Sequence, residues 1–572
     1  MNKIAETVSI VLVTLCCIIT EVNSFRNRKD DSSESTSEKL SDFFEKPMVA
    51  GVCLLGLFGI YLVTRLFHLG IAPMGMHIDE IGMAYDAVCL SESGVDRWGH
   101  AMPVYLANFN TGQSAMYAYL TALLLKFAPF SVKLIRIPAV IIGAAAFFAF
   151  YVIGSEMTGK KLGGLIASTL MVINPFLLMS ERWALDCNLY VSMAAVSMAV
   201  LIVAMKKDRV VGYLIAGLSW GLTLYTYILS YPVIPLFAVF VCVMIVRRRN
   251  GKNHTFGKIA AFLAPIFLFG LPLLLEQLVN LNFIPAFSFL GSDYFAFAAE
   301  RAEQFSLLNV PGNIGTITYQ LFTGDELTYN ALEEFGPILR PLIPLIYYGL
   351  YLTVKKIVVA IKQKSWEGIS SYALVLAFGV LAYLLTLSIN GLGFNRYNEL
   401  FLSFVIFELI ALWEILNTQK LKAVLEAVPV LVTAVYFILF AKFYYTDMND
   451  VYGFHLLFYP TEIGDEIRFS QNISESNKGK KYYILAQYDM LEGIDLMISI
   501  YGDVSQEDWL AYTNGQTGNS IGNYCLEFPE EFDENEDAVY IIGNDWNHIT
   551  DYMISVGFAA DRTFDNHVLL FK

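Results

Sequence analysis

Two adjacent carboxylates, Asp79 and Glu80, follow the first long apolar stretch of this 572-residue chain. A carboxylate placed beside an acceptor hydroxyl can act as a general base. The alternative is a solvated pair of loop charges, because charged residues usually lie on solvated faces. Apolar residues and glycines surround the pair in the sequence GMHIDEIGMAYDAV, and this setting favours a packed loop.

Other charged residues occur in similar short connections between apolar runs. Arg182 and Asp186 stand in SERWALDCNLY, and Arg396 stands in NGLGFNRYNEL. If these connections share one side of a membrane, the guanidinium groups could hold a phosphorylated substrate near a general base. Two alternatives remain open, an i,i+4 ion pair for Arg182 with Asp186 and an interfacial arginine for Arg396.

Aromatic and histidine residues give weaker signals. Tyr225 and Tyr227 fit either an aromatic belt at the membrane interface or contacts to a substrate. His77 and His100 lie in the same loop as the acidic pair, but a lone histidine is more often structural than a metal ligand. The sequence shows no strong metal cluster, so a metal site stays unknown and a divalent cation possible.

The composition is that of a membrane protein. Hydrophobic residues make up 56% of the chain and charged residues 16%, whereas soluble domains carry about 25% charged residues. We predict an α-helical polytopic protein with about eleven transmembrane helices, each of about 20 residues. The predicted spans are residues 48–69, 132–156, 162–180, 187–205, 211–229, 232–246, 258–279, 340–360, 370–389, 398–416 and 422–441.

The positive-inside rule orients these spans. Every second connection carries lysine or arginine and is expected to be cytoplasmic. These residues are Lys160, Lys161, Lys206, Lys207, Arg209, Arg247, Arg248, Arg249, Lys252, Lys355, Lys356, Lys362, Lys364, Lys420 and Lys422. The first outer loop, residues 70–131, then lies outside together with the C-terminal part of the chain. Within this loop, the amphipathic sequence AYDAVCLSESG is expected to form a helix along the membrane surface.

Three regions are expected. Residues 1–46 combine a short apolar segment with a polar cytoplasmic linker. That apolar segment could be signal-like, interfacial or an extra span. Residues 47–441 form the transmembrane domain. Residues 442–572 read as a small extracytoplasmic α/β domain, because strand-like runs such as AVYIIGND alternate with helical patterns such as NHITDYMISVGF.

The C-terminal region is also strongly acidic. Residues 443–572 contain 23 acidic and six basic residues, a balance of −17. Nothing in the chain resembles the basic footprint of a nucleic-acid-binding protein. The region could be a solubilising cap, or it could cover the site or select an acceptor.

The first outer loop resembles the start of a GT-C superfamily glycosyltransferase. The resemblance rests on the acidic pair in HIDEIGMAYD, the YAYL helix that follows, and the RIP sequence at Arg136 that enters the second span. The nearer branch contains the protein O-mannosyltransferases and the aminoarabinose transferases. The similarity is clear over residues 48–230 and weaker over residues 231–441.

The resemblance implies a polyprenyl-phosphate-linked monosaccharide donor and an enzyme of the bacterial plasma membrane. It implies that Asp79 is the catalytic base of an inverting transfer, and Glu80 could orient the acceptor, pair with an arginine or help bind a metal. Arg182, Arg396, Arg136 and Lys133 are candidates to receive the departing phosphate. The acceptor could be a protein, a glycopolymer or a glycolipid.

A transporter or flippase of a lipid-linked saccharide is the alternative function. Such proteins often carry ionisable groups near the middle of the membrane. The predicted spans contain few charges, with Glu408 as the main exception and Glu276 near a span end. This distribution favours chemistry at the membrane interface.

Overall fold

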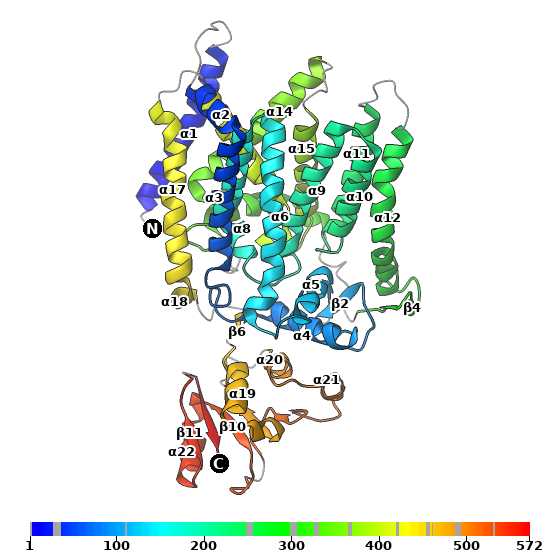
Figure 1. Ribbon diagram of the computed structural model, residues 1–572, viewed down its shortest axis with the longest axis vertical. Helices are drawn as coiled ribbons and strands as arrows, with labels where there is room; N and C mark the ends of the chain where they lie inside the picture. The colour runs from blue at the N-terminus through cyan, green and yellow to red at the C-terminus, as the bar shows by residue number, and fades with distance from the viewer. Residues whose placement is uncertain are drawn as a thin grey trace.

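The computed structural model describes most of the chain. The described residues are 3–26, 36–108, 111–247, 255–297, 306–324, 331–363, 369–418, 423–452, 458–459, 461–486, 493–529, 532–564 and 566–572. They form a helical bundle with a small α/β unit at one end (Figure 1). We call the end of the bundle next to this unit the domain-bearing end.

Within the described residues, nine helices are long and apolar enough to cross a membrane. They are α1 (Lys3–Arg26), α3 (Pro47–Leu66), α6 (Val132–Thr158), α9 (Asn188–Lys207), α11 (Ser230–Arg247), α12 (Thr255–Asn280), α14 (Ile343–Gln363), α16 (Leu400–Asn417) and α17 (Ala423–Thr446). The chain is therefore a multi-pass membrane protein, and eight of these helices coincide with predicted spans.

The other three predicted spans are shorter apolar helices: α7 (Lys161–Ile173), α10 (Val210–Thr223) and α15 (Ser370–Thr386). The predicted span over residues 162–180 is divided into two helices. Helix α7 stops before Asn174, whose side chain caps the next helix, α8 (Pro175–Ser180), by accepting from Leu177 N at 3.0 Å. Pro175 fits only the first turn of the new helix because proline lacks a backbone donor.

The N-terminal apolar segment is longer than its 12-residue apolar run suggests. Helix α1 spans 24 residues and packs against α14 and against η4 (Arg340–Leu342). Arg340 pairs with Glu6 at 3.0 Å, and Lys355 pairs with Glu21 at 2.6 Å. The earlier acidic residue pairs with the earlier basic residue, and the later with the later, at equal spacing in the sequence. Helices α1 and α14 therefore run parallel.

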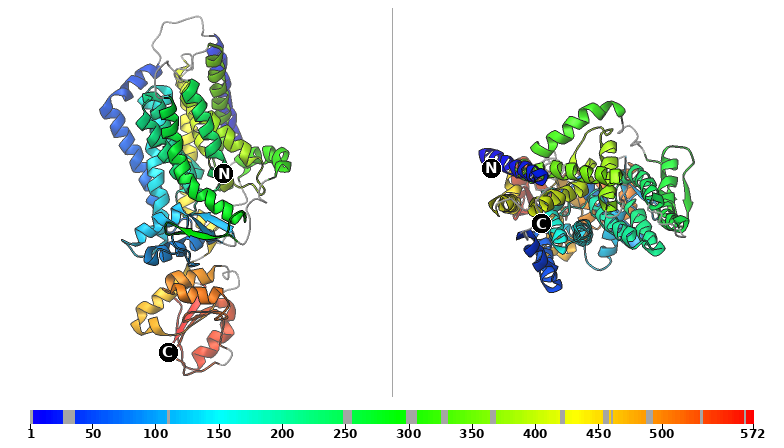
Figure 2. Two further views of the ribbon diagram at one scale, coloured as in Figure 1. Left: turned by 90° about the vertical axis from the view of Figure 1, so that its right-hand side faces the viewer. Right: turned by 90° about the horizontal axis from the view of Figure 1, so that it is seen from above.

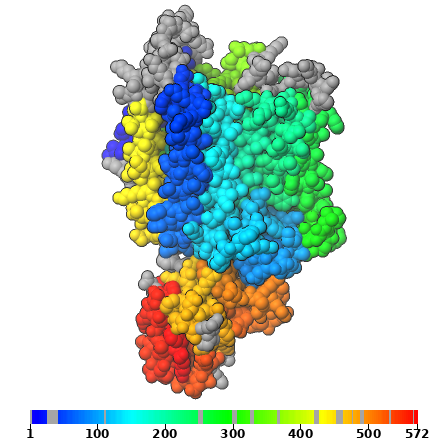
Figure 3. Space-filling model, viewed as in Figure 1, coloured from blue at the N-terminus to red at the C-terminus, as the bar shows by residue number. Residues whose placement is uncertain are grey.

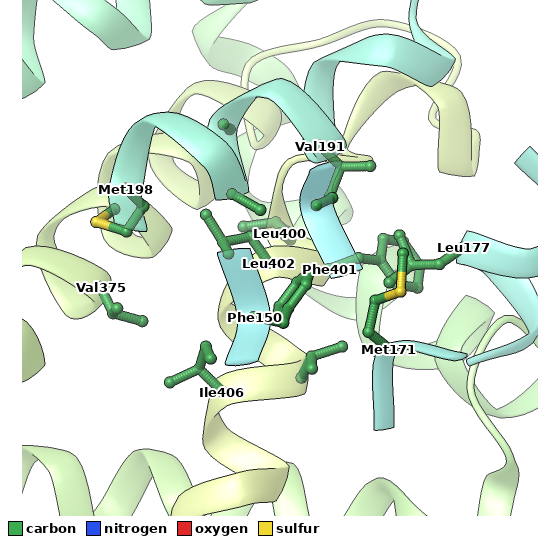
Figure 4. Close-up of a cluster of buried hydrophobic side chains, with 14 of the residues drawn as sticks. Phe150, Met171, Leu177, Val191, Met198, Val375, Leu400, Phe401, Leu402 and Ile406 are labelled. Atoms are coloured by element: carbon green, nitrogen blue, oxygen red, sulfur yellow. The ribbon is translucent and has the colours of Figure 1, made fainter. Parts of the chain in front are cut away.

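Apolar side chains fill the centre of the bundle. Phe150, Met171, Val191, Phe401 and Ile406 are among the buried side chains there (Figure 4). They come from α6, α7, α9 and α16, which pack against one another. This core fixes the ends of the helices from which the connecting loops start.

The first long loop lies at the domain-bearing end (Figure 1). It contains β1 (Met76–His77), α4 (Ile78–Ser93), the β2–β3 hairpin (Tyr105–Asn108 and Thr111–Ser114) and α5 (Met116–Leu125). The helix predicted here is confirmed. Most of α4 is buried rather than lying on a surface, because the bundle covers one side and the α/β unit covers another.

The same end carries two further pieces of local structure. The hairpin of β4 (Phe287–Phe289) and β5 (Ser292–Tyr294) follows α12, and α13 (Val310–Thr323) follows η3 (Leu307–Asn309). The amide of Asn313 on α13 donates to the backbone of Leu387 at 2.9 Å and of Ile389 at 2.8 Å. These bonds attach α13 to the connection that carries Arg396.

The C-terminal unit has a six-stranded mixed sheet in the order β11-β12-β10-β7-β9-β8. The predicted strands and helices are confirmed here. The strands are β7 (Tyr482–Leu485), β8 (Ser520–Ile521), β9 (Tyr524–Cys525), β10 (Val539–Gly543), β11 (Ala559–Asp561) and β12 (His567–Phe571). The helices are α19 (Glu462–Ile473), α20 (Ile494–Tyr501), α21 (Gln506–Thr513) and α22 (Asn547–Ser555). Helices α19 and α20 share one apolar layer with the sheet, and α22 shares the other.

Basic residues gather at the bundle end opposite this unit, where the chain turns from α6 to α7 and from α9 to α10 (Figure 1). Lys160 pairs with Asp42 of α2 (Thr36–Glu45) at 3.4 Å, and Lys206 pairs with Glu156 at 2.6 Å. Residues 248, 249, 252, 364, 420 and 422 of the predicted basic set lie outside the described residues.

Candidate functional site at the start of helix α4

The first turn of α4 fixes the position of Asp79. His77 caps the helix, with Nδ1 accepting from Asp79 N at 3.1 Å. Glu80 Oε2 accepts from His77 N at 3.2 Å, which completes a capping box. Burial lowers the pKa of His77 because it disfavours the charged imidazolium. A neutral histidine can accept this bond, so His77 has a structural role in the helix start.

The Asp79 carboxylate remains accessible. Its side chain is 38% exposed, and Oδ1 accepts a hydrogen bond from Asn108 Nδ2 at 2.9 Å. Asn108 is buried at the end of β2. One oxygen of Asp79 is therefore oriented by the hairpin while the group can still meet a substrate.

Glu80 is in a different setting, although it is the next residue. Its side chain is fully buried, and its two oxygens accept from Arg136 at 2.8 and 3.0 Å. Ala184 N donates a further bond to Oε1 at 2.8 Å. Arg136 also donates to the carbonyl groups of Pro73 and Gly75. Glu80 thus joins the loop, α6 and the connection before α9.

Asn108 is held in turn by a second buried ion pair. Arg97 Nη2 donates to Asn108 Oδ1 at 2.7 Å, and Arg97 Nη1 lies 3.2 Å from Asp86 Oδ2. Burial raises the pKa of Asp86 to about 7, with the Arg97 guanidinium opposing that shift. The chain of contacts runs from Asp79 through Asn108 and Arg97 to Asp86. We call these last three residues the Asn108 relay.

Gly82 makes room for the relay. Arg97 Nη1 donates to the Gly82 carbonyl oxygen. A Cβ at position 82 would collide with Asn108 Oδ1 and lie 2.8 Å from Arg97 Nη1. Only glycine permits this close approach of α4 to the hairpin.

Arg182 is also fully buried and bound by the protein. Its guanidinium donates to the backbone carbonyl groups of Thr64, Arg65, Phe67 and Ala72 at 2.7–2.9 Å. Because these carbonyls end α3 and open the first loop, Arg182 ties the loop to the bundle. Its predicted contact with phosphate would require these bonds to be exchanged, and the same holds for Arg136.

Asp186 joins the hairpin to the start of α9. Oδ2 accepts from Ser114 N of β3 at 2.9 Å, and Oδ1 accepts from Cys187 N at 2.7 Å. Asn398 Nδ2 then donates to the Cys187 carbonyl at 2.6 Å. These bonds bring the second and third predicted connections against the hairpin that carries Asn108.

The remaining predicted residues lie at the same end of the bundle. Arg396 is half-buried, with Nη1 3.4 Å from the Asn390 carbonyl. Tyr225 lies in the turn between α10 and α11, where its carbonyl accepts from Met116 N at 3.3 Å. Tyr227 is buried, with its ring 6.4 Å from the ring of Tyr190.

A family model and several solved structures match this chain. The family model for dolichyl-phosphate-mannose-protein mannosyltransferase matches residues 113–271. The crystal structure of ArnT from Cupriavidus metallidurans bound to undecaprenyl phosphate superposes with a TM-score of 0.52 at 9% identity, covering 92% of this chain and 98% of ArnT. The apo ArnT structure gives a TM-score of 0.51 at 10% identity, covering 91% and 98%. The chain has the GT-C fold.

A weaker similarity extends to another GT-C protein. The archaeal oligosaccharyltransferase AglB from Archaeoglobus fulgidus, in complex with an inhibitory peptide and a dolichol-phosphate, gives a TM-score of 0.46 at 11% identity, covering 90% of this chain and 71% of AglB. No curated protein matches the chain by sequence.

Within this GT-C fold, the part of the chain that the structure describes contains no group of three His, Cys, Asp or Glu side chains suited to a metal ion. His100 instead lies 3.0 Å from Asp96 in the turn that carries Arg97. Metal dependence stays a prediction.

The Asn108 relay in the first long loop was not predicted from the sequence. Asn108, Arg97 and Asp86 all lie within residues 70–131, and Asp86 is a charged residue in the mostly apolar run IGMAYDAVCL. That setting is a usable signal for a buried ion pair, because unpaired charges are rarely buried. The pairing itself depends on how the hairpin folds back over α4.

Proposed function

We propose that the protein transfers a monosaccharide from a polyprenyl-phosphate donor to an acceptor hydroxyl, with Asp79 as the base. The observation that carries the proposal is the contrast between two neighbouring carboxylates. Asp79 is 38% exposed and oriented by Asn108, whereas Glu80 is buried and bound by Arg136. An oriented, accessible carboxylate is suited to proton abstraction.

The proposed step breaks one bond and forms another at the anomeric carbon. The acceptor hydroxyl gives its proton to Asp79 as its oxygen bonds to the anomeric carbon. The bond from that carbon to the phosphate oxygen breaks, and the lipid phosphate leaves with the electron pair. Phosphate needs no general acid if a cation receives it. Attack opposite the leaving phosphate inverts the anomeric centre.

Arg396 is the proposed phosphate ligand among the predicted arginines. Arg136 and Arg182 are fully buried, with their guanidinium groups bound to a carboxylate or to several carbonyl oxygens. Arg396 is half-buried in a connection that contacts the Asp186 region through Asn398. A planar guanidinium matches a phosphate group well.

A groove in the membrane region suits the lipid part of such a donor. It has a volume of about 450 Å³ between α10, α11 and α12, and Leu224, Tyr231, Phe267 and Leu274 are among its mostly apolar lining residues. The Tyr231 ring lies 6.4 Å from the ring of Tyr105 on β2. This contact connects the groove to the β2–β3 hairpin, whose first strand ends at Asn108. The similarity to ArnT bound to undecaprenyl phosphate supports the same donor class.

The active site and the C-terminal unit are proposed to lie outside the plasma membrane. The basic residues at the opposite end of the bundle support this orientation, because positive charge favours the cytoplasmic side. The acceptor could be a protein, a glycopolymer or a glycolipid.

A transfer assay in proteoliposomes tests the proposal. Radiolabelled polyprenyl-phosphate monosaccharides are supplied to the wild type, to Asp79→Asn and to Glu92→Gln, a control at an exposed position of the same helix. We expect label to leave the lipid with the wild type and the control only. Retained transfer by folded Asp79→Asn would refute Asp79 as the base. No release from any donor would refute the donor class.

A further inference from the structure

The C-terminal unit packs on the side of α4 that faces away from the bundle. The space-filling view shows the orange segment that contains α20 and α21 pressed against the blue first loop (Figure 3), and a turned view shows the unit directly below the loop (Figure 2). Leu496, Met497 and Ile500 of α20 share one buried apolar cluster with Ile81 and other residues of α4.

Helix α20 starts at a glycine with a left-handed backbone, within ordinary contact distance of α4. Gly493 has a φ of +73°, and a Cβ there would lie 3.6 Å from Ile81 Cδ1 and 3.8 Å from Ile78 Cγ1. Ile78 and Ile81 flank Asp79 and Glu80 in the sequence, three residues apart, so they lie on one face of the helix. The neighbouring face carries Asp79 and Gly82 toward Asn108. The C-terminal unit therefore supports α4 from behind the candidate site.

Helix α21 contacts the turn that carries Arg97. The Trp509 ring is buried between Tyr85, at 5.2 Å, and Trp98, at 6.1 Å. Gln506 Nε2 donates to the Asp96 carbonyl oxygen. Trp98 Nε1 in turn donates to the Ala107 carbonyl at 3.1 Å, beside Asn108. Residues 96–98 thus contact α21 on one side and the hairpin on the other.

A backbone pairing adds a third connection. Strand β6 (Phe458–Tyr459) pairs with β1 in antiparallel register, with Tyr459 opposite Met76 and Phe458 opposite His77. His77 is the residue that caps α4. The segment that leads into the C-terminal unit therefore forms a sheet with the strand immediately before Asp79.

We propose that the C-terminal unit is a positioning element of the transferase, with Gln506 and Trp509 keeping α4 and the Asn108 relay in the geometry that orients Asp79. This inference rests on the proposed function. It assigns the unit a role in the rate of transfer, distinct from solubilising the protein or binding the acceptor.

Steady-state kinetics in proteoliposomes test this role with Gln506→Ala, Trp509→Ala, Trp509→Phe and Trp546→Ala. Trp546→Ala is the matched control, because this tryptophan of the same unit is 38% exposed and its ring contacts His548. For Trp509→Ala we expect kcat to fall at least ~10-fold, with KM for donor and acceptor within about twofold. Trp509→Phe should recover most of the rate, and Trp546→Ala should match the wild type.

Gln506→Ala keeps the test decisive if Trp509→Ala does not fold, because it removes one hydrogen bond and leaves the apolar cluster intact. In a double-mutant cycle of Gln506→Ala with Asn108→Ala, the losses in kcat should be non-additive, since both changes act on the same relay.

Two results would overturn the inference. One is full additivity in this cycle, and the other is an unchanged kcat in the Gln506 and Trp509 variants while Asp79→Asn is inactive. A rise only in KM for the acceptor would also overturn it, because it would indicate acceptor binding. Transfer by Asp79→Asn would instead refute the proposed function.

Discussion

The side-chain amide of Asn108 joins Asp79 to the interior of the loop, donating to Asp79 Oδ1 at 2.9 Å while its own oxygen accepts from Arg97 at 2.7 Å. A side-chain amide whose nitrogen and oxygen both form hydrogen bonds is held in one orientation. It therefore restricts the carboxylate that it binds. The proposed catalytic carboxylate is therefore oriented by contacts that continue into the interior of the loop.

Replacing Asn108 with Ala should reduce kcat about 10- to 100-fold, because misplacement of a catalytic group by about 1 Å can cost that much. The KM for the donor should change little. Steady-state transfer in proteoliposomes measures both quantities. Asn472→Ala, at an exposed position of α19, is the control. An unchanged kcat would show that Asp79 does not need this bond.

Gly82→Ala should also lower kcat, because its new Cβ would displace Asn108. The new Cβ would collide with Asn108 Oδ1, so α4 and the hairpin must separate. We expect at least ~10-fold loss of transfer. Gly59→Ala on α3 is the matched control, because no atom lies within 4 Å of the position that its Cβ would take. Wild-type activity in Gly82→Ala would mean that the hairpin can move away from α4 without lowering the rate of transfer.

Glu80→Gln should act mainly on stability. It removes the charge that compensates the fully buried Arg136, and breaking a buried pair in this way costs about 3–5 kcal/mol. Thermal unfolding of the detergent-solubilised protein should show a lower Tm and a smaller folded fraction. The exposed Glu92→Gln serves again as the control. A normal Tm with lost transfer would instead indicate a direct role of Glu80 in the reaction.

Glu466 predicts a pH dependence of stability. Its side chain is buried on α19, with Oε1 3.5 Å from His567 Nδ1 and Glu462 and Asp465 nearby, and burial raises its pKa to about 9. The native state then binds a proton that the unfolded state releases above about pH 4.3. The stability from this group is present at low pH and is lost as the pH rises through 9.

We therefore expect a Tm several degrees lower at pH 9.5 than at pH 7, because each kcal/mol of lost stability lowers Tm by about 2–8 °C, depending on the size of the unfolding unit. Glu466→Gln should flatten this dependence, and the exposed Asp551→Asn on α22 should leave it unchanged. Thermal unfolding across the pH series measures the effect. The same slope in Glu466→Gln would assign the pH dependence to other groups.

Much of the fold follows from local sequence patterns. Apolar runs predicted the positions of the long helices, and strand-like runs such as AVYIIGND predicted strands such as β10. The break between α7 and α8 was missed because the apolar run continues through Asn174 and Pro175. The partners of Arg136 and Arg182 could not be predicted either, since backbone carbonyls and a carboxylate from distant segments meet only in the folded chain.

The choice of Asp79 as a site residue rests on its resemblance to a family motif and stays a prediction. The structure adds an orienting partner for it that local pattern does not reveal. Helix α4 was predicted as a surface helix from its amphipathic sequence. The face of α4 that was expected to be exposed is covered by residues more than 400 positions further along the sequence, such as Met497 and Trp509.

The pairing of β1 with β6 also sets an order of events during biosynthesis. Met76 pairs with Tyr459, which at 5–20 residues per second leaves the ribosome roughly 20–80 s later. During that interval the nascent chain carries Asp79 on a helix whose outer face has no partner. A chain truncated before α20 would insert its helices and still lack the packing behind α4, so the support of Asp79 is in place only after synthesis is nearly complete.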